Sequence, residues 1–98
     1  MAEKKEKAKS PRDVLIEKID QMTPGQELWY RLSPMYGKDL IVVLANKDFP
    51  GKRISRYAVQ GADDIDGKPG PKRRTYWESN KAKPVALWLI GRTAELIS

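Results

Sequence analysis

Residues 39–45 of the chain read DLIVVLA, and five large apolar residues follow one another from Leu40 to Leu44. An unbroken apolar run of this length, rich in β-branched residues, is typical of a strand that is buried on both faces. Residues 27–32 and 52–60, on either side, have the mixed or alternating pattern of further strands. The connections between them are short, whereas a parallel crossover needs about a dozen residues or more. The sequence therefore predicts three consecutive antiparallel strands.

A helix is predicted on the N-terminal side of these strands. Ser10 can cap it, Pro11 suits its first position, and apolar residues recur at helical spacing as far as Met22. The segment Thr23-Pro24-Gly25 should end this helix.

The C-terminal part of the chain adds a loop, a strand and a second helix. Residues 61–71 are rich in Gly and Pro and predict a mobile loop, while residues 72–78 predict a fourth strand. Pro84 fits the first turn of a helix that extends to Ile97. The expected fold is α+β, in the order α-β-β-β-β-α: a four-stranded antiparallel meander with the N- and C-terminal helices packed on it.

Composition indicates one small basic domain. The chain has 98 residues and a formal net charge of +6; residues 1–10 hold four Lys and two Glu, or +2, which leaves +4 for the rest. We expect residues 1–10 to form a disordered basic tail and residues 11–98 to form a single domain. The lack of Cys fits a reducing compartment, and no apolar signal segment follows the N-terminus. The apolar run 85–90 is too short to cross a bilayer of ~30 Å. These features predict a cytoplasmic protein without membrane contact.

The predicted sheet suggests a surface for single-stranded nucleic acid. If Leu28 and Tyr30 point into the core, Trp29 and Arg31 point away from it, and Arg73 and Trp77 would share that outer face if the registers agree. Aromatic rings stack on bases and guanidinium groups hold phosphates, so the predicted nucleic-acid-binding residues are Trp29, Arg31, Arg53, Arg56, Arg73, Arg74 and Trp77. The commoner alternative is that a Trp lies under a helix and the cations form a solvated rim.

The last helix suggests a second surface. At 100° per residue its apolar side chains cover an arc of about 200°, whereas a helix on one sheet needs about 100°. The apolar surface that one sheet would leave uncovered favours contact of this helix with the first helix, a second copy of the chain or another protein. The residues predicted for such a homodimer or partner interface are Leu87, Trp88, Gly91 and Arg92. Alternatively, Trp88 lies against a loop of the same chain.

No pattern in the sequence announces a catalytic or metal site. The chain contains neither His nor Cys, so a general base would have to be Asp, Glu, Lys or Tyr. The acidic segment 63–67 resembles part of a calcium loop, but Ala62 and Arg73 occupy the first and last ligand positions. Residues 67–70 lack the spacing of a phosphate loop. We therefore expect a binding module without catalytic activity, cofactor or metal.

Overall fold

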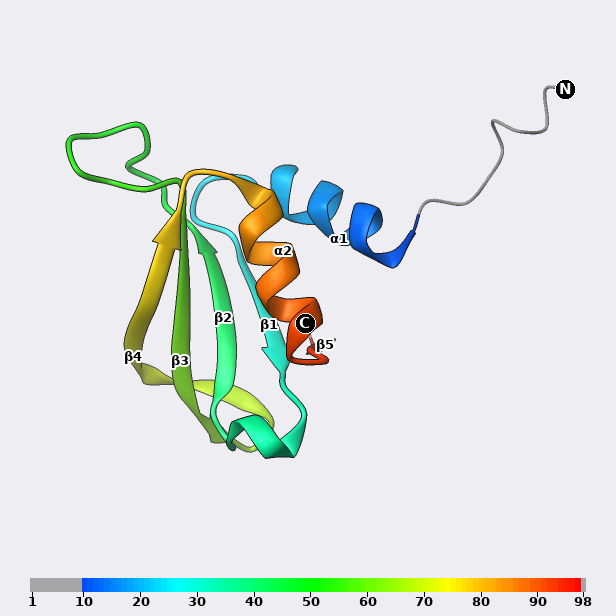
Figure 1. The fold of residues 1–98 in the computed structure, drawn as a ribbon. Helices are drawn as coiled ribbons and strands as arrows, with labels where there is room; N and C mark the ends of the chain where they lie inside the picture. Colours follow the sequence, from blue (N-terminus) through cyan, green and yellow to red (C-terminus); the bar gives the residue numbers. More distant parts are fainter. Residues whose placement is uncertain (1–9, 98) are drawn as a thin grey trace, which may run out of the picture.

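A computed structural model describes residues 10–97, so the tail predicted for residues 1–10 lies, apart from Ser10, outside the described residues. The fold is α+β, as predicted, with two α-helices and an antiparallel sheet (Figure 1). The elements are α1 Pro11–Asp20, β1 Glu27–Arg31, the 3-10 helix η2 Pro34–Tyr36, β2 Leu40–Ala45, β3 Tyr57–Ile65, β4 Lys68–Ser79, α2 Ala82–Gly91 and β5 Glu95–Leu96.

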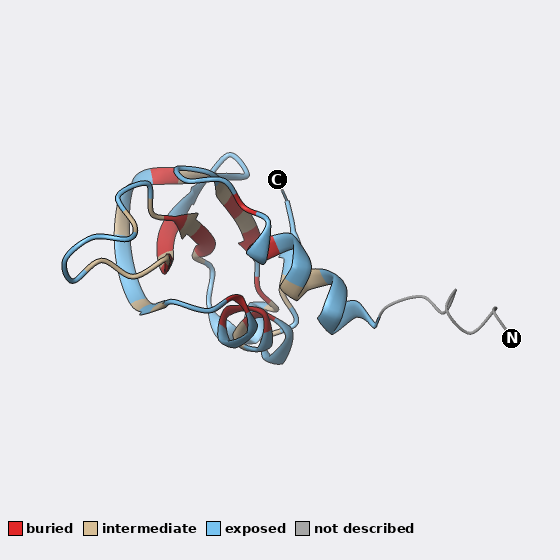
Figure 2. Cartoon of the chain, turned by 90° about the horizontal axis from the view of Figure 1, so that it is seen from above, coloured by how far each residue is buried: buried red, intermediate tan, exposed pale blue. Residues whose placement is uncertain are grey.

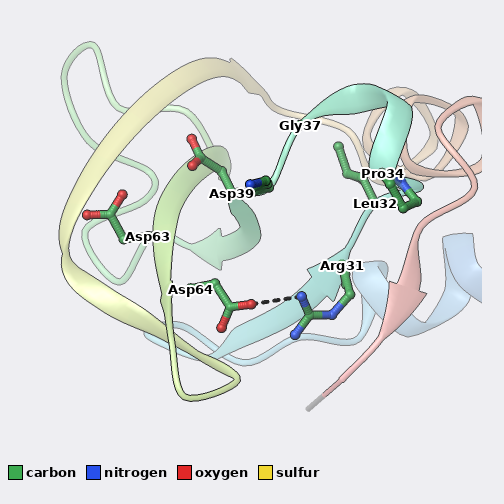
Figure 3. Close-up of a pocket in the computed structure, with 8 residues that line it drawn as sticks. Arg31, Leu32, Pro34, Gly37, Asp39, Asp63 and Asp64 are labelled. Carbon is green, nitrogen blue, oxygen red and sulfur yellow. Dashed lines mark hydrogen bonds and ion pairs between the residues drawn. The ribbon is translucent and has the colours of Figure 1, made fainter.

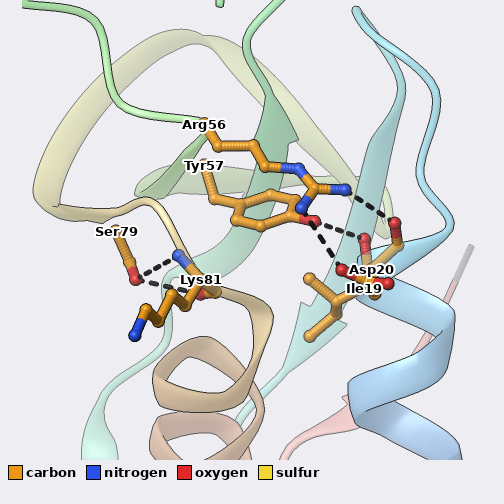
Figure 4. Close-up of polar contacts among 6 residues, drawn as sticks. All are labelled: Ile19, Asp20, Arg56, Tyr57, Ser79 and Lys81. Atoms are coloured by element: carbon orange, nitrogen blue, oxygen red, sulfur yellow. Dashed lines mark hydrogen bonds and ion pairs between the residues drawn. The ribbon is translucent and has the colours of Figure 1, made fainter. Parts of the chain in front are cut away.

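The start of α1 is fixed by its own sequence. The Ser10 hydroxyl accepts a hydrogen bond from the Asp13 N–H at 3.2 Å, and Pro11 takes a first-turn position where no N–H is needed. The end of the helix is tied to the sheet: the buried Tyr57 hydroxyl donates to the Ile19 carbonyl at 3.0 Å, and Arg56 pairs with Asp20 (Figure 4). Both contacts orient α1 against the first residues of β3.

The sheet has five strands rather than the four predicted, in the order β4-β3-β2-β1-β5. The extra strand arises because α2 ends at Gly91 instead of continuing to Ile97. Thr93 has a φ of 54°, its N–H donates to the Ile90 carbonyl, and the Ala94 N–H donates to the Leu89 carbonyl. This is a Schellman motif with a left-handed residue at its usual place, and it reverses the chain. The residues that follow pair with β1, with Leu96 opposite Tyr30.

The loop predicted for residues 61–71 is wrong, because β3 and β4 continue through most of it. They are joined by a tight turn at Asp66 and Gly67, whose φ values of 54° and 83° are those of a type I′ hairpin turn. Pro69 and Pro71 fit β4 because it is the edge strand of the sheet, where an N–H can be missing. Residues 52–56, predicted to begin a strand, lie outside β3.

The sheet is strongly coiled. Its register shifts twice between β3 and β4, once between Val59 and Gln60 and once between Ala62 and Asp64. Such bulges bend strands and increase their twist. The tip of the β3–β4 hairpin consequently curves back toward β1, as the side view and the view from above show (Figures 1 and 2).

Both helices cover the same face of the sheet, which we call the helix face. The main core lies there, and the alternation of the strands brings Tyr30, Val43 and Val59 into contact with Ile19 of α1 and with apolar residues of α2. The opposite face, the inner face, is enclosed by the coil itself. Its residues Leu40, Val42 and Ala62 are fully buried although no helix covers them.

Within residues 10–97, neither helix has the length and apolar character that a membrane crossing requires.

Candidate functional site: an aromatic cleft beside the last helix

The two tryptophans predicted to form a platform lie on opposite faces of the sheet. Trp29 is half-buried on the inner face, where its indole N–H donates to Glu27 Oε1 at 3.0 Å. Trp77 is opposite Val59 and packs against the main core on the helix face, whereas Arg73 is opposite Ala62 on the inner face. The shared face expected for Trp29, Arg73 and Trp77 is therefore wrong. The register shift leaves an extra residue in β4, and one residue is enough to reverse the faces.

Four of the five predicted phosphate-binding arginines are already paired with carboxylates. The ion pairs are Arg31–Asp64 at 2.8 Å (Figure 3), Arg56–Asp20 at 3.2 Å (Figure 4), Arg73–Glu27 at 3.1 Å and Arg74–Asp39. The hydrogen bond from Arg31 holds the pKa of Asp64 below its ordinary value, and the Gly67 N–H adds to this effect. Arg53, in the loop before β3, pairs with no carboxylate among the described residues. A phosphate would have to displace a carboxylate from each of the other four.

The residues predicted on α2 for a partner interface are divided between two environments. Trp88 lies against Trp77, with ring centroids 6.1 Å apart, and Arg92 stacks on Trp88 with its guanidinium carbon 4.2 Å from the ring centroid. The Gly91 carbonyl faces η2 and accepts from the Tyr36 hydroxyl at 3.4 Å. Trp88 therefore packs within its own chain, but against strand β4 rather than against a loop as in the alternative interpretation. Leu87 remains 42% exposed.

A cleft with three aromatic rings lies between η2, β4 and the end of α2. Its volume is about 350 Å³, and its lining residues are Leu32, Tyr36, Gly37, Lys38, Asp39, Ile41, Tyr76, Trp88 and Arg92. Tyr36 is 47% exposed and Tyr76 is 45% exposed, so both rings are available to a ligand. We call this site the aromatic cleft. Its apolar floor is supplied by Leu32 and Ile41, which are buried.

The position of the Tyr76 ring depends on a glycine in the neighbouring strand. Tyr76 is the residue that the register shift leaves unpaired in β4, and its ring lies over Gly61 of β3. A Cβ atom at position 61 would overlap the Tyr76 hydroxyl. The bulge and the glycine together place this tyrosine in the cleft.

Electrostatically, the aromatic cleft combines cations with one neutralised acid. The Asp39 carboxylate accepts hydrogen bonds from Arg74 and from the Tyr76 hydroxyl, the latter at 3.3 Å. The hydrogen bond to Tyr76 and the charge of Asp39 raise the pKa of Arg74 further. With Asp39 balanced by Arg74, Lys38 and Arg92 leave the cleft with a positive charge.

A second cavity, of about 610 Å³, lies on the other side of the loop at residues 37–39 (Figure 3). Its carboxylates are Asp39, Asp63 and Asp64, and Arg31 and Lys38 are its cations. Across residues 10–97, no three His, Cys, Asp or Glu side chains are grouped so that they could hold a metal ion. This second cavity contains charges of both signs, and its Arg31 is already paired with Asp64. We interpret it as a solvated part of the inner face.

Sequence reasoning singled out two members of the aromatic cleft and missed the others. Trp88 and Arg92 were identified through their helical spacing. Tyr36 and Lys38 lie in the short connection between the first two predicted strands, and Tyr76 lies within the strand predicted for residues 72–78, whose pattern gives no sign of the bulge. The segment 34–37, Pro-Met-Tyr-Gly, places one aromatic residue between turn-forming residues and is the signal in the sequence for this part of the cleft. Comparison of the chain with protein-family models, curated proteins and solved structures gave no match.

Proposed function

We propose that this chain is a non-catalytic binding module that holds single-stranded nucleic acid in the aromatic cleft. The observation that carries the proposal is the convergence of three aromatic rings and two cations, Lys38 and Arg92, on one cleft. Single-stranded nucleic acids are bound by this combination, because bases stack on rings while cations neutralise the backbone.

The exposed rings provide the stacking surface. Tyr36 and Tyr76 present roughly half of their surface to solvent. Trp88 is a less exposed part of the lining, and the Arg92 guanidinium stacks on its ring. The volume of the cleft lies in the range of about 300–1,000 Å³ that is usual for small-ligand sites, which suits an unstacked base better than a duplex.

The overall charge supports the same class of ligand. The chain carries a net charge of +6 at neutral pH, and the two cleft cations that face no carboxylate partner among residues 10–97 are Lys38 and Arg92. A positive molecule attracts polyanions at long range, and each phosphate contact adds to the salt dependence of binding. The rings then supply the contact that distinguishes a single strand from a duplex.

Fluorescence anisotropy with a labelled single-stranded oligonucleotide tests this proposal. Affinity should fall as salt rises from about 50 to 200 mM, and Tyr36→Ala should weaken binding about tenfold, since each base–aromatic stack contributes about 1–3 kcal/mol. Tyr36→Phe keeps the ring and should bind like the parent. Lys47→Gln, which removes an exposed cation in the remote β2–β3 loop, serves as the charge control.

Two results would contradict the proposal. One is the absence of binding even at low salt. The other is an equal loss in Tyr36→Ala and Lys47→Gln, which would indicate diffuse attraction of a polyanion to a basic surface.

Self-association through α2 is a second candidate, favoured by the exposure of Leu87 and Ile90 on a helix whose opposite side, with Val85, Ala86 and Leu89, is buried. Light scattering would then report twice the chain mass, and Leu87→Glu would return it to the monomer. A monomer at every concentration would exclude this candidate.

A further inference from the structure

An apolar groove lies between α1, the end of α2 and β5, away from the aromatic cleft. Its volume is about 490 Å³, and it is lined by Pro11, Val14, Leu15, Lys18, Tyr30, Ile90, Ala94 and Leu96. None of these residues lines the aromatic cleft. Val14, Ile90 and Leu96 leave about half of their surface exposed, so the groove has apolar walls that no part of residues 10–97 covers.

The floor of the groove contains a buried hydroxyl without a partner. Tyr30 is only 3% exposed, and its hydroxyl makes no hydrogen bond within the described residues. Burying a hydrogen-bonding group without a partner costs free energy, so such groups call for an explanation such as a ligand. The hydroxyl is protonated at neutral pH, as any tyrosine is, and burial raises its pKa further, to about 12. A ligand for this groove therefore needs an acceptor.

The same groove also contains a cation. Lys18, in the last turn of α1, lines the same groove, is exposed, and forms no ion pair with any carboxylate of residues 10–97. A lysine ammonium and a phenol hydroxyl are both donors. Together they match an acceptor that carries negative charge.

We propose that this groove binds a free monocarboxylate with an apolar chain, an amphiphile of the fatty-acid type. The chain lies along Val14, Ile90 and Leu96, and the carboxylate accepts hydrogen bonds from Lys18 and from the Tyr30 hydroxyl. The volume of the groove falls in the usual range for small-ligand sites, which are mostly apolar with a few placed polar groups. This site is independent of the proposed nucleic-acid function.

Calorimetry and amide chemical shifts, with decanoate below its micelle concentration and decanol as the uncharged analogue, test the proposal. The parent protein should bind decanoate at least tenfold more tightly than decanol, with shifts centred on residues 14, 94 and 96. Lys18→Gln should abolish most of this preference while leaving decanol binding unchanged. Tyr30→Phe should weaken decanoate several-fold. Lys47→Gln, which removes another exposed lysine, should match the parent.

Three results would overturn the proposal. Equal affinity for decanoate and decanol would show that Lys18 and the Tyr30 hydroxyl do not bind the carboxylate. Shifts in the aromatic cleft, rather than in the groove, would place the ligand elsewhere. Failure of decanoate to bind, together with a doubled mass in light scattering that Leu96→Asp reverses, would assign the groove to a second copy of the chain. Because Leu87 lies outside the groove, Leu87→Glu distinguishes that outcome from dimerisation through the exposed side of α2.

Discussion

Tyr30 and Tyr57 are two buried tyrosines in the same core with different hydrogen bonding. The Tyr57 hydroxyl donates to the Ile19 carbonyl, whereas the Tyr30 hydroxyl has no partner among the described residues. Tyr57 therefore connects α1 to the sheet, and Tyr30 contributes apolar contact at the cost of an unsatisfied group. Their replacement by Phe should have opposite effects on stability.

Tyr30→Phe should raise the free energy of unfolding by about 1 kcal/mol at neutral pH, because it removes a buried polar atom that forms no hydrogen bond. Tyr57→Phe, the matched control, should lower the free energy of unfolding by a similar amount, since it leaves the Ile19 carbonyl without its donor. Urea denaturation of both variants measures the difference. A loss of stability in Tyr30→Phe would show that the hydroxyl has a partner in solution.

Alkaline pH provides a second measurement on Tyr30. Its pKa is about 12 in the folded chain and 10.0 when unperturbed, so the folded state binds the proton more tightly. This contribution to stability is complete below pH 10 and is lost as pH rises through 12, by roughly 3 kcal/mol at most, since each pKa unit is worth about 1.4 kcal/mol. Urea midpoints between these pH values should fall more steeply for the parent than for Tyr30→Phe. Parallel curves would contradict the raised pKa.

Among the elements, the end of α2 shows how one residue changes the topology. Thr93 adopts a left-handed conformation, which is costly for a β-branched side chain, and this reversal directs residues 95–96 into the sheet. The apolar pattern from Val85 to Ile97 gives no sign of the reversal, because Leu96 and Ile97 also fit a continuing helix.

Thr93→Gly should stabilise the fold by about 1 kcal/mol, because glycine takes a left-handed φ without a steric penalty. Thermal unfolding measures the gain, and Thr93→Ala, which retains a Cβ, should gain less. Equal effects of both substitutions would mean that the strain at this position is small.

The register shift in β4 is the other decisive feature at this scale. Gly61→Ala should displace the Tyr76 ring, lower the free energy of unfolding by about 1 kcal/mol or more, and weaken oligonucleotide binding. Gly91→Ala, at the last residue of α2, is the control for an added methyl group, because a Cβ there meets no atom within 4 Å. Unchanged oligonucleotide affinity in a folded Gly61→Ala variant would separate Tyr76 from the proposed site.

At the scale of the whole molecule, two ion pairs connect β1 to the β3–β4 hairpin across the inner face of the sheet. Arg73 of β4 reaches Glu27 of β1, and Asp64 of β3 reaches Arg31 of β1, although β2 lies between β1 and β3 in the sheet. They hold the hairpin tip over the inner face, where buried apolar residues have no helix to cover them.

A double-mutant cycle with Glu27→Gln and Arg73→Met should give a coupling energy of about 1 kcal/mol, because both side chains are largely withdrawn from solvent. The solvent-exposed pair Arg12–Asp13 in α1 is the comparison and should couple less. Chemical denaturation in urea, which leaves ionic strength unchanged, measures both cycles. Additive effects at Glu27 and Arg73 would show that apolar contacts alone close the coil.

The sequence predicts the antiparallel meander and the two helices packed on it, but not the fifth strand, the end of α2 or the face on which Trp77 lies. The strand expected at residues 39–45 is β2 at Leu40–Ala45, and the Ser10 cap starts α1 as expected, since both depend on nearby residues. The face on which Trp77 lies depends on a bulge, and β5 depends on Thr93; neither leaves a periodic signature. The aromatic cleft was only partly predictable, because it joins a turn, a bulged strand and a helix end that are remote in sequence.

The long edge strand β4 also has a protective consequence for the molecule as a whole. Its outer side offers twelve residues of backbone on which another chain could grow a sheet. Pro69 and Pro71 lack the amide hydrogen that such growth requires, and Lys68 and Lys72 place positive charge beside them. The prolines that make this segment resemble a loop thus disfavour pairing of β4 with a strand of another molecule.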